Sequence, residues 1–176
     1  MHSKRLIASP TNREIQLPDN AFITSKTDLA GKITYGNSLF IEISGYPESC
    51  LLGAPQSIVR HPDMPRGVFH LLWETIKRGQ EFVGYVKNMT ADGSFYWVLA
   101  TVTPDFDEQK NIKGFYSVRR RPKRAAIQCL EAVYRQMQQA ESAVGKIAQP
   151  QTGIEVLHTL IKDKGIASYE DFVLAL

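Results

Sequence analysis

FVGYVKNMTADGSFYWVLATVT, residues 82–103, is the stretch that decides the fold of this chain. Its two halves, 82–88 and 94–103, are rich in β-branched and aromatic residues, which favour strands. Between them lies Ala91-Asp-Gly93, and an Asp-Gly pair is a strong signal for the tight turn of a hairpin. The stretch therefore predicts two antiparallel strands joined by a short turn.

Three more strands are predicted around this hairpin. Residues 21–26 and 32–35 flank Asp28-Leu-Ala-Gly31, where glycine supplies the positive φ of a tight turn. Residues 112–119 form the last strand, after a charged loop. Short connections favour antiparallel pairing. The expected fold class is therefore α+β, with a five-stranded antiparallel sheet, short helices on one face of it, and further helices at the C-terminus.

The segment between the second and third strands is predicted to be helical. Asn37 caps a short helix over residues 38–44. A longer helix begins at Pro65 and runs to Arg78, because apolar residues recur on one face and Gly79 follows as a typical helix end.

Beyond residue 121 the pattern becomes that of a helix that packs on another helix. Leu130, Met137 and Val144 recur every seven residues. Residues 149–153 are predicted to break this helix, and two small helices follow that fold back on the domain or dock on a partner, since short helices are marginal alone. The expected organisation is a cap segment over 1–19, a main domain over 20–121, an amphipathic helix over 122–148 and small helices over 149–176.

The composition excludes several classes of protein. With 21 basic and 18 acidic residues, the net charge of +3 is too balanced for nucleic acid to be the main partner. The basic excess lies in residues 118–124, which suit phosphate or an anionic membrane surface, although a solvated junction is the simpler interpretation. Cys50 and Cys129 are too few for a disulfide framework or a metal site. No signal-peptide core and no apolar run long enough to span a membrane is found.

The segment that contains Arg60, His61, Asp63 and Trp73 outlines a ligand site. It brings two cationic side chains, a carboxylate and an indole close together in the sequence, between prolines that stiffen the loop and reduce the entropy lost on binding. Each residue also has a simpler interpretation. The indole can belong to the core, the Arg-His pair can be surface charge, and Asp63 can cap the next helix or pair with Arg60.

Four blocks of the sequence resemble the PAS domain of bacterial aerotaxis receptors. They are Ile58-Val-Arg-His-Pro-Asp-Met-Pro65, Leu72-Trp-Glu-Thr-Ile-Lys-Arg-Gly79, Tyr85-Val-Lys-Asn88 and Asp92-Gly-Ser-Phe-Tyr-Trp-Val98. The blocks have the order and spacing of that family, and the resemblance covers residues 20–121. It implies a PAS fold for this region, with FAD held noncovalently and its redox state reported as the signal.

The resemblance also implies which residues hold the flavin. In the family, the arginine, histidine and aspartate of the first block and the tryptophan of the helix beyond are needed for flavin binding, and here they match Arg60, His61, Asp63 and Trp73. The asparagine that matches Asn88 is implicated around the flavin, and an Asn side chain offers both a donor and an acceptor. Neither a catalytic residue nor a metal site is expected.

The receptors of this family continue into a membrane anchor, a HAMP domain and a signalling coiled coil, whereas this sequence stops at Leu176. It therefore resembles the split arrangement, in which a stand-alone PAS protein works with a separate membrane-bound, methyl-accepting chemotaxis-type transducer through its HAMP region. The resemblance implies an energy-taxis sensor of redox state or oxygen. We expect a cytoplasmic protein that reaches the membrane only through this partner, and not an enzyme.

Two other functions stay open on the sequence. A cofactor-free PAS interaction module would use the heptad helix to form a homodimer, and a haem-binding gas sensor would use His70 as an axial ligand. A light sensor is not expected, because photoreceptors of the LOV kind place a reactive cysteine in a block that here reads Pro55-Gln-Ser-Ile-Val59, and Cys50 lies outside it. No glycine-rich dinucleotide fingerprint supports an oxidoreductase.

Overall fold

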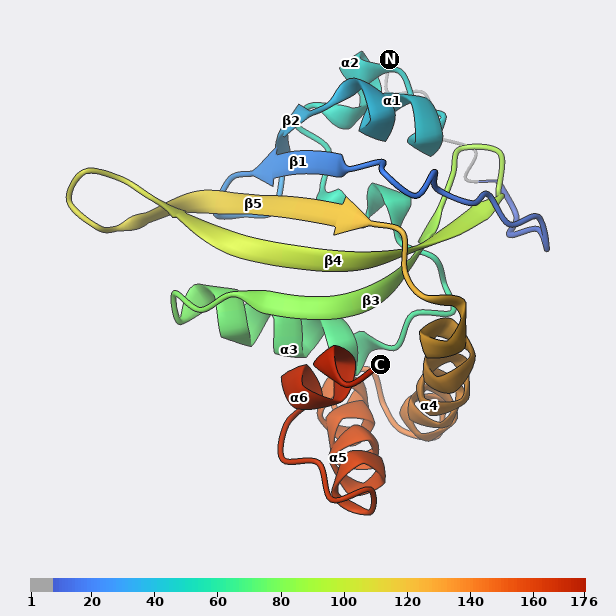
Figure 1. Ribbon diagram of the computed structural model, residues 1–176. Helices are drawn as coiled ribbons and strands as arrows, with labels where there is room; N and C mark the ends of the chain where they lie inside the picture. The colour runs from blue at the N-terminus through green and yellow to red at the C-terminus, as the bar shows by residue number, and fades with distance from the viewer. Residues whose placement is uncertain (1–7) are drawn as a thin grey trace.

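The computed structural model, in which residues 8–176 are described, contains one five-stranded antiparallel sheet (Figure 1). The strands are β1 (Ile23–Thr27), β2 (Ile33–Gly36), β3 (Phe82–Met89), β4 (Phe95–Phe106) and β5 (Ile112–Arg120), in the spatial order β2-β1-β5-β4-β3. The predicted fold class and all five predicted strands are confirmed. Residues 1–7 lie outside the described part, and the prediction of no signal peptide rests partly on them.

The β3–β4 hairpin forms as the sequence predicts. Its ladder runs from Phe82 opposite Val102 to Met89 opposite Phe95. The turn closes where the Thr90 N–H donates to the Ser94 carbonyl at 2.8 Å. Gly93 has a φ of 87°, a backbone conformation that favours glycine.

Four short helical elements cover the inner face of the sheet. They are α1 (Ser38–Ser44), α2 (Glu48–Leu51), the 3-10 helix η1 (Gln56–Val59) and α3 (Arg66–Lys77). The side chain of Asn37 caps α1 by accepting from the Phe40 N–H at 3.0 Å, as predicted. The predicted long helix is α3, with Pro65 at its N-cap.

The register of the strands decides which side chains meet these helices. Side chains alternate between the two faces of a strand. The inner face carries Val86 and Asn88 of β3, Ala100 and Val102 of β4, Phe115, Ser117 and Arg119 of β5, and Ser25 and Thr27 of β1. Polar and charged residues thus share this inner face with apolar ones.

Three C-terminal helices pack along the β3 edge of the sheet (Figure 1). They are α4 (Arg124–Ser142), α5 (Gln149–Lys162) and α6 (Tyr169–Leu174). The helix predicted over 122–148 is shorter than expected, and the break predicted at 149–153 is wrong, because it lies at 143–148. Pro150 lies in the first turn of α5 instead of ending a helix, since the first turn of a helix does not need the N–H that proline lacks.

The C-terminal helices fold back on the domain, which is one of the two arrangements that the sequence predicted. The heptad residues Leu130 and Met137 are fully buried inside the chain, where α4 packs against α5. Helix α5 also packs against α3 so closely that a Cβ on Gly67 would lie 3.0 Å from the Pro150 carbonyl oxygen and the Ile154 nitrogen. The heptad therefore serves packing within the chain, which removes the basis for a homodimer along this stripe.

The outer backbone edge of β3 is occupied by the rest of the chain. The Lys87 carbonyl accepts from the His61 N–H at 3.3 Å, and the Lys87 N–H donates to the Met64 sulfur at 3.2 Å. Further along, the Tyr134 hydroxyl of α4 donates to the Tyr85 carbonyl at 2.8 Å. The loop before α3 and the helix α4 therefore meet along the same edge.

Candidate functional site

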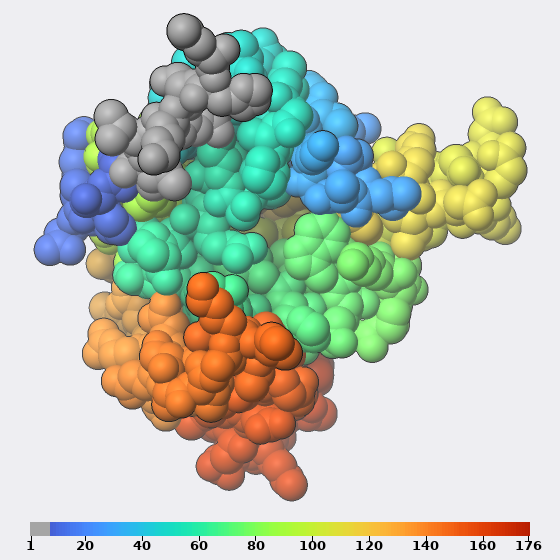
Figure 2. Space-filling model, turned by 180° about the vertical axis from the view of Figure 1, so that it is seen from behind, coloured from blue at the N-terminus to red at the C-terminus, as the bar shows by residue number. Residues whose placement is uncertain are grey.

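A cavity of about 230 Å³ lies between the inner face of the sheet and the elements η1 and α3. In the view of Figure 2, the surface is hollowed where α3, the segment around η1 and the β1–β2 turn come together. The cavity has one largely aromatic wall and one polar wall. Such a mixture is typical of sites for small organic ligands.

The aromatic wall is built by α3 and β5. Trp73 meets Phe115 edge to face with the ring centroids 5.5 Å apart, and the Arg60 guanidinium lies 3.7 Å from the centroid of the Phe69 ring. The β1–β2 turn closes over the indole at Gly31, where a Cβ would lie 2.9 Å from a Trp73 ring carbon. This wall offers flat apolar surface to a ligand.

The polar wall contains buried groups without a hydrogen-bond partner among the described residues. Four of them line the cavity: Gln56 Nε2, Arg60 Nε, Ser117 Oγ and Arg119 Nη1. The other atoms of two of these side chains are held in place, since Arg119 Nη2 donates to Ser25 Oγ at 3.0 Å and Ser25 Oγ donates to Gln56 Oε1 at 3.2 Å. Because buried polar atoms are normally paired, these free groups point to a polar ligand.

The cavity is also positively charged. Arg60 and Arg119 both line it, and none of the described residues that line it is an aspartate or a glutamate. Burial lowers the pKa of each guanidinium, and the nearby charge of Arg66 lowers the pKa of Arg60 further. Two cations facing a cavity without a carboxylate favour a ligand that carries negative charge or acceptor atoms.

The structure brings three of the predicted site residues together. Arg60, Trp73 and Asn88 all line the cavity, and the backbones of Arg60 and Asn88 are joined by a β-bridge. His61 and Asp63 are not among the residues that line it. They belong to the loop that connects the cavity to the β3 edge.

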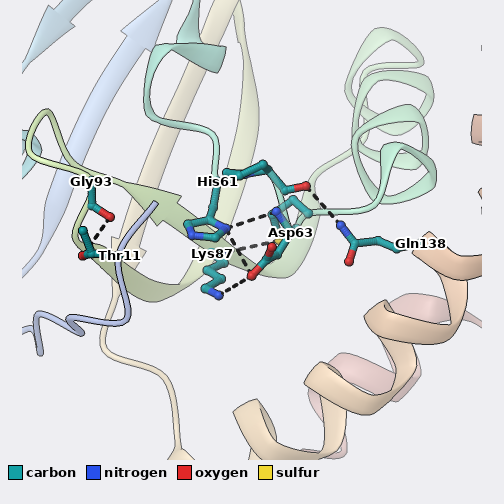
Figure 3. Close-up of polar contacts among 8 residues, drawn as sticks. Thr11, His61, Asp63, Lys87, Gly93 and Gln138 are labelled. Carbon is teal, nitrogen blue, oxygen red and sulfur yellow. Dashed lines mark hydrogen bonds and ion pairs between the residues drawn. The ribbon is translucent and has the colours of Figure 1, made fainter. Parts of the chain in front are cut away.

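Asp63 has a different partner from the two that the sequence suggested (Figure 3). Its carboxylate forms an ion pair with Lys87 at 2.7 Å, and not with Arg60. It does not cap α3 either, because the N-cap of that helix is Pro65 without a side-chain hydrogen bond. The turn at His61, where the Asp63 N–H donates to His61 Nδ1 at 3.1 Å, directs the carboxylate toward β3.

Helix α4 holds this loop and the start of α3. Gln138 donates from Nε2 to the Pro62 carbonyl at 3.0 Å (Figure 3). One turn further along, the carboxylate of Glu141, which is only 5% exposed, accepts from the N–H groups of Arg66 and Gly67, both at 2.8 Å. A carboxylate at this end of a helix pairs free N–H groups and interacts favourably with the helix dipole.

Sequence reasoning missed the polar wall formed by Ser25, Gln56, Ser117 and Arg119. The signal for Ser25, Ser117 and Arg119 was the alternation of side chains in the first and last strands, whose pairing sets Ser25 directly opposite Ser117. Arg119 was hidden in the basic run over 118–124, which was interpreted as solvated or as an anion-binding surface.

That interpretation of the basic run is wrong for Arg119, whereas Arg120, Arg121, Lys123 and Arg124 are exposed at the junction between β5 and α4. Arg119 is only 6% exposed. Arg121 pairs with Asp19 at 2.6 Å, and Arg124 pairs with Glu14 at 2.8 Å. These pairs bind the N-terminal segment to the start of α4.

His70 has no place in the cavity. Its side chain is 44% exposed and pairs with Glu74 at 3.3 Å, and it is not among the residues that line the cavity. Within residues 8–176, no cluster of metal-ligating side chains is found. The same residues contain no helix that is long and apolar enough to cross a bilayer.

His61 is expected to make stability depend on pH. Burial and then the charge of Lys87 lower the pKa of His61 below its ordinary value near 6.5. The unfolded chain therefore binds this proton more tightly than the folded protein does. The contribution of neutral His61 to the free energy of unfolding is fully present above pH 6.5, and it is lost as the pH drops through the lowered pKa. Urea unfolding between about pH 8 and about pH 5 measures this slope.

The matched variants for this experiment are His61→Gln and His70→Gln. We expect His61→Gln to flatten the slope between the two pH limits, whereas His70→Gln, at an exposed position, should leave it as it is. A His61→Gln protein with the slope of the wild type would show that another group titrates.

Comparisons with known proteins agree with this architecture. Residues 33–119 match the family model of the PAS fold. The aerotaxis receptor of Escherichia coli (strain K12) is 39% identical over 125 residues, which are 71% of this chain and 24% of the receptor. The biofilm dispersion protein BdlA of Pseudomonas aeruginosa is 30% identical over 97 residues, which are 52% of this chain and 22% of that protein.

A solved structure shows the same fold. The light-state structure of the LOV domain of the blue-light photoreceptor Aureochrome1 has a TM-score of 0.57 and 21% identity, and the likeness covers 61% of this chain and 87% of that chain. The chain spans about a quarter or less of the length of the two curated relatives. The family match and these relatives show that residues 33–119 form a domain of the PAS family, in a chain related to the aerotaxis receptor.

Proposed function

We propose that this PAS domain binds FAD noncovalently and senses redox state or oxygen in energy taxis. The observation that carries the proposal is the cavity itself, in which an aromatic wall faces four polar atoms that no described residue pairs by a hydrogen bond. A flavin ring is planar and carries donors and acceptors along its edge, so it matches both walls. The relation to an aerotaxis receptor and the PAS/LOV fold support the same ligand.

The residues present fit a flavin ring. The cavity is smaller than the roughly 300 to 1,000 Å³ of sites that enclose a whole drug-sized ligand, so it suits the ring and not the entire dinucleotide. Trp73 and Phe69 would hold the ring by its faces and edges. Asn88 would offer a donor and an acceptor to its polar edge, and Arg60 would serve a phosphate or another acceptor at the wall.

When bound, FAD supplies a redox centre whose charge and protonation differ between its two states. The chain must bind these states with different affinities in two conformations, because equal affinity shifts no equilibrium. Asn88 is suited to linking the state of the ring to the conformation of the chain. Its side chain lines the cavity, and its backbone bridges to Arg60 at the start of the loop held by α4. The contacts of Gln138 and Glu141 would pass a change in this loop to the C-terminal helices.

The proposed partner is a membrane-bound, methyl-accepting chemotaxis-type transducer, contacted through its HAMP region. The relation to chemotaxis and aerotaxis signalling proteins supports this class of partner. In this proposal the protein acts in the cytoplasm, reaches the membrane through the transducer, and catalyses no reaction of its own.

The absorption spectrum of freshly purified protein tests the proposal. We expect a yellow protein with a flavin spectrum that bleaches with dithionite and returns in air. Chromatography of the ligand released on denaturation should identify it as FAD. A folded, colourless protein that takes up no added FAD would contradict the proposal and leave the cofactor-free module.

A further inference from the structure

Arg119 is a buried cation without a matching anion. Its side chain is 6% exposed, and no carboxylate among the described residues pairs with it. One guanidinium nitrogen, Nη2, donates to Ser25 Oγ, and the guanidinium carbon lies 5.5 Å from the centroid of the Phe40 ring. The second terminal nitrogen, Nη1, has no hydrogen-bond partner among the described residues and belongs to a side chain that lines the cavity.

This arrangement is unfavourable unless a ligand supplies the counter-charge. Burying a charge without a counter-charge is costly, and replacing such a group by an apolar one of similar size is often neutral or stabilising. The nearby Arg121 and Arg124 both have carboxylate partners, whereas Arg119 has none among the described residues. The missing anion is therefore expected to enter the cavity with the ligand.

The direction of the guanidinium is fixed by the protein. The hydrogen-bond chain from Arg119 through Ser25 to Gln56 holds Nη2, so Nη1 keeps its place without a ligand. Arg60 differs, because its guanidinium is stacked on the Phe69 ring. Arg119 is thus the better candidate for a direct contact with a ligand inside the cavity.

Building on the proposed flavin site, we propose that Arg119 contacts the bound ring through Nη1 and makes the cavity favour the reduced ring as its anion. In this step a two-electron reductant, dithionite in the experiment, gives two electrons to the ring, and the ring takes up one proton. The second proton, which would make the reduced ring neutral, stays in the solvent. Arg119 thereby couples the charge of the ring to the wall formed by β1 and β5.

Three variants test the proposal: Arg119→Met, Arg119→Lys and, as a matched control, Arg120→Met on the exposed side of the same strand. The first measurement is urea unfolding of flavin-free protein. We expect Arg119→Met to be as stable as the wild type or more stable, because it removes an unpaired buried charge. Arg120→Met should change little.

The second measurement is a redox titration of the flavin-loaded proteins over a range of pH, followed by absorbance. We expect one proton per two electrons in the wild type, Arg119→Lys and Arg120→Met. In Arg119→Met we expect a shift toward two protons per two electrons, or flavin that is lost from a folded protein. Either result would support the contact, since it would show that the bound ring depends on a positive charge at residue 119.

Two results would overturn the proposal while leaving the proposed function intact. One is a flavin-loaded Arg119→Met protein with the proton count of the wild type. The other is a flavin-free Arg119→Met protein that is clearly less stable than the wild type, which would make Arg119 a structural residue. A wild-type protein that holds no flavin would contradict the proposed function itself, so the two failures are distinguishable.

Discussion

A Trp73→Ala protein is expected to stay folded and to lose most of its flavin. The indole is only partly buried and lines the cavity next to Phe115, so its removal opens the wall against which the ring would lie. Aromatic stacking alone is worth about 0.5 to 1.5 kcal/mol beyond burial. The upper value corresponds to about tenfold weaker binding, and lost apolar contact adds to it.

The ratio of flavin to protein after gel filtration and the dissociation constant for added FAD measure this effect. Trp73→Phe is the conservative variant, and it should retain most of the flavin because it keeps an aromatic ring in the wall. Trp97→Phe is the control on the opposite face of the sheet, where Trp97 stacks with Tyr134. Normal flavin content in a folded Trp73→Ala protein would rule out the stacking role.

A Glu141→Ala protein is expected to lose about 2 to 5 kcal/mol of unfolding free energy. The change removes the acceptor of two N–H groups at the start of α3, that of Gly67, which is buried, and that of Arg66, which is partly buried. Each unpaired buried group costs about 1 to 3 kcal/mol. The lost interaction with the helix dipole adds a smaller amount.

Urea unfolding of Glu141→Ala, Glu141→Gln and Glu131→Ala separates this cap from general effects of charge. Glu131 lies exposed on the same helix, so its removal should change the stability by less than about 0.5 kcal/mol. Glu141→Gln keeps an acceptor and should fall between the two. Equal stability of Glu141→Ala and Glu131→Ala would show that water replaces the carboxylate.

The sheet and its covering helices could be predicted because their signals are local. The Asp-Gly turn, the glycine at residue 31 and the cap at Asn37 each act within a few residues, and the structure confirms all three. The boundary between α4 and α5 was predicted wrongly because proline both ends helices and begins them. Only the packing of α5 against α3 and α4 distinguishes the two.

The candidate site was predictable in part for the same reason. Arg60 and Trp73 lie close together in the sequence, in two neighbouring blocks, and Asn88 lies on the strand to which Arg60 is bridged. Arg119 could not be found in this way, because its place depends on the register between β1 and β5 and on the number of residues before it in the strand. A shift of one residue would have turned its side chain to the other face.

The cover of the β3 edge has a consequence for solubility. A bare edge strand offers its free backbone groups to any other chain and is a route to fibrils. Here the loop at His61 and the Tyr134 hydroxyl form hydrogen bonds with backbone groups of this edge. The C-terminal helices thus help to prevent β3, the strand that carries Asn88, from pairing with a strand of another copy of the chain.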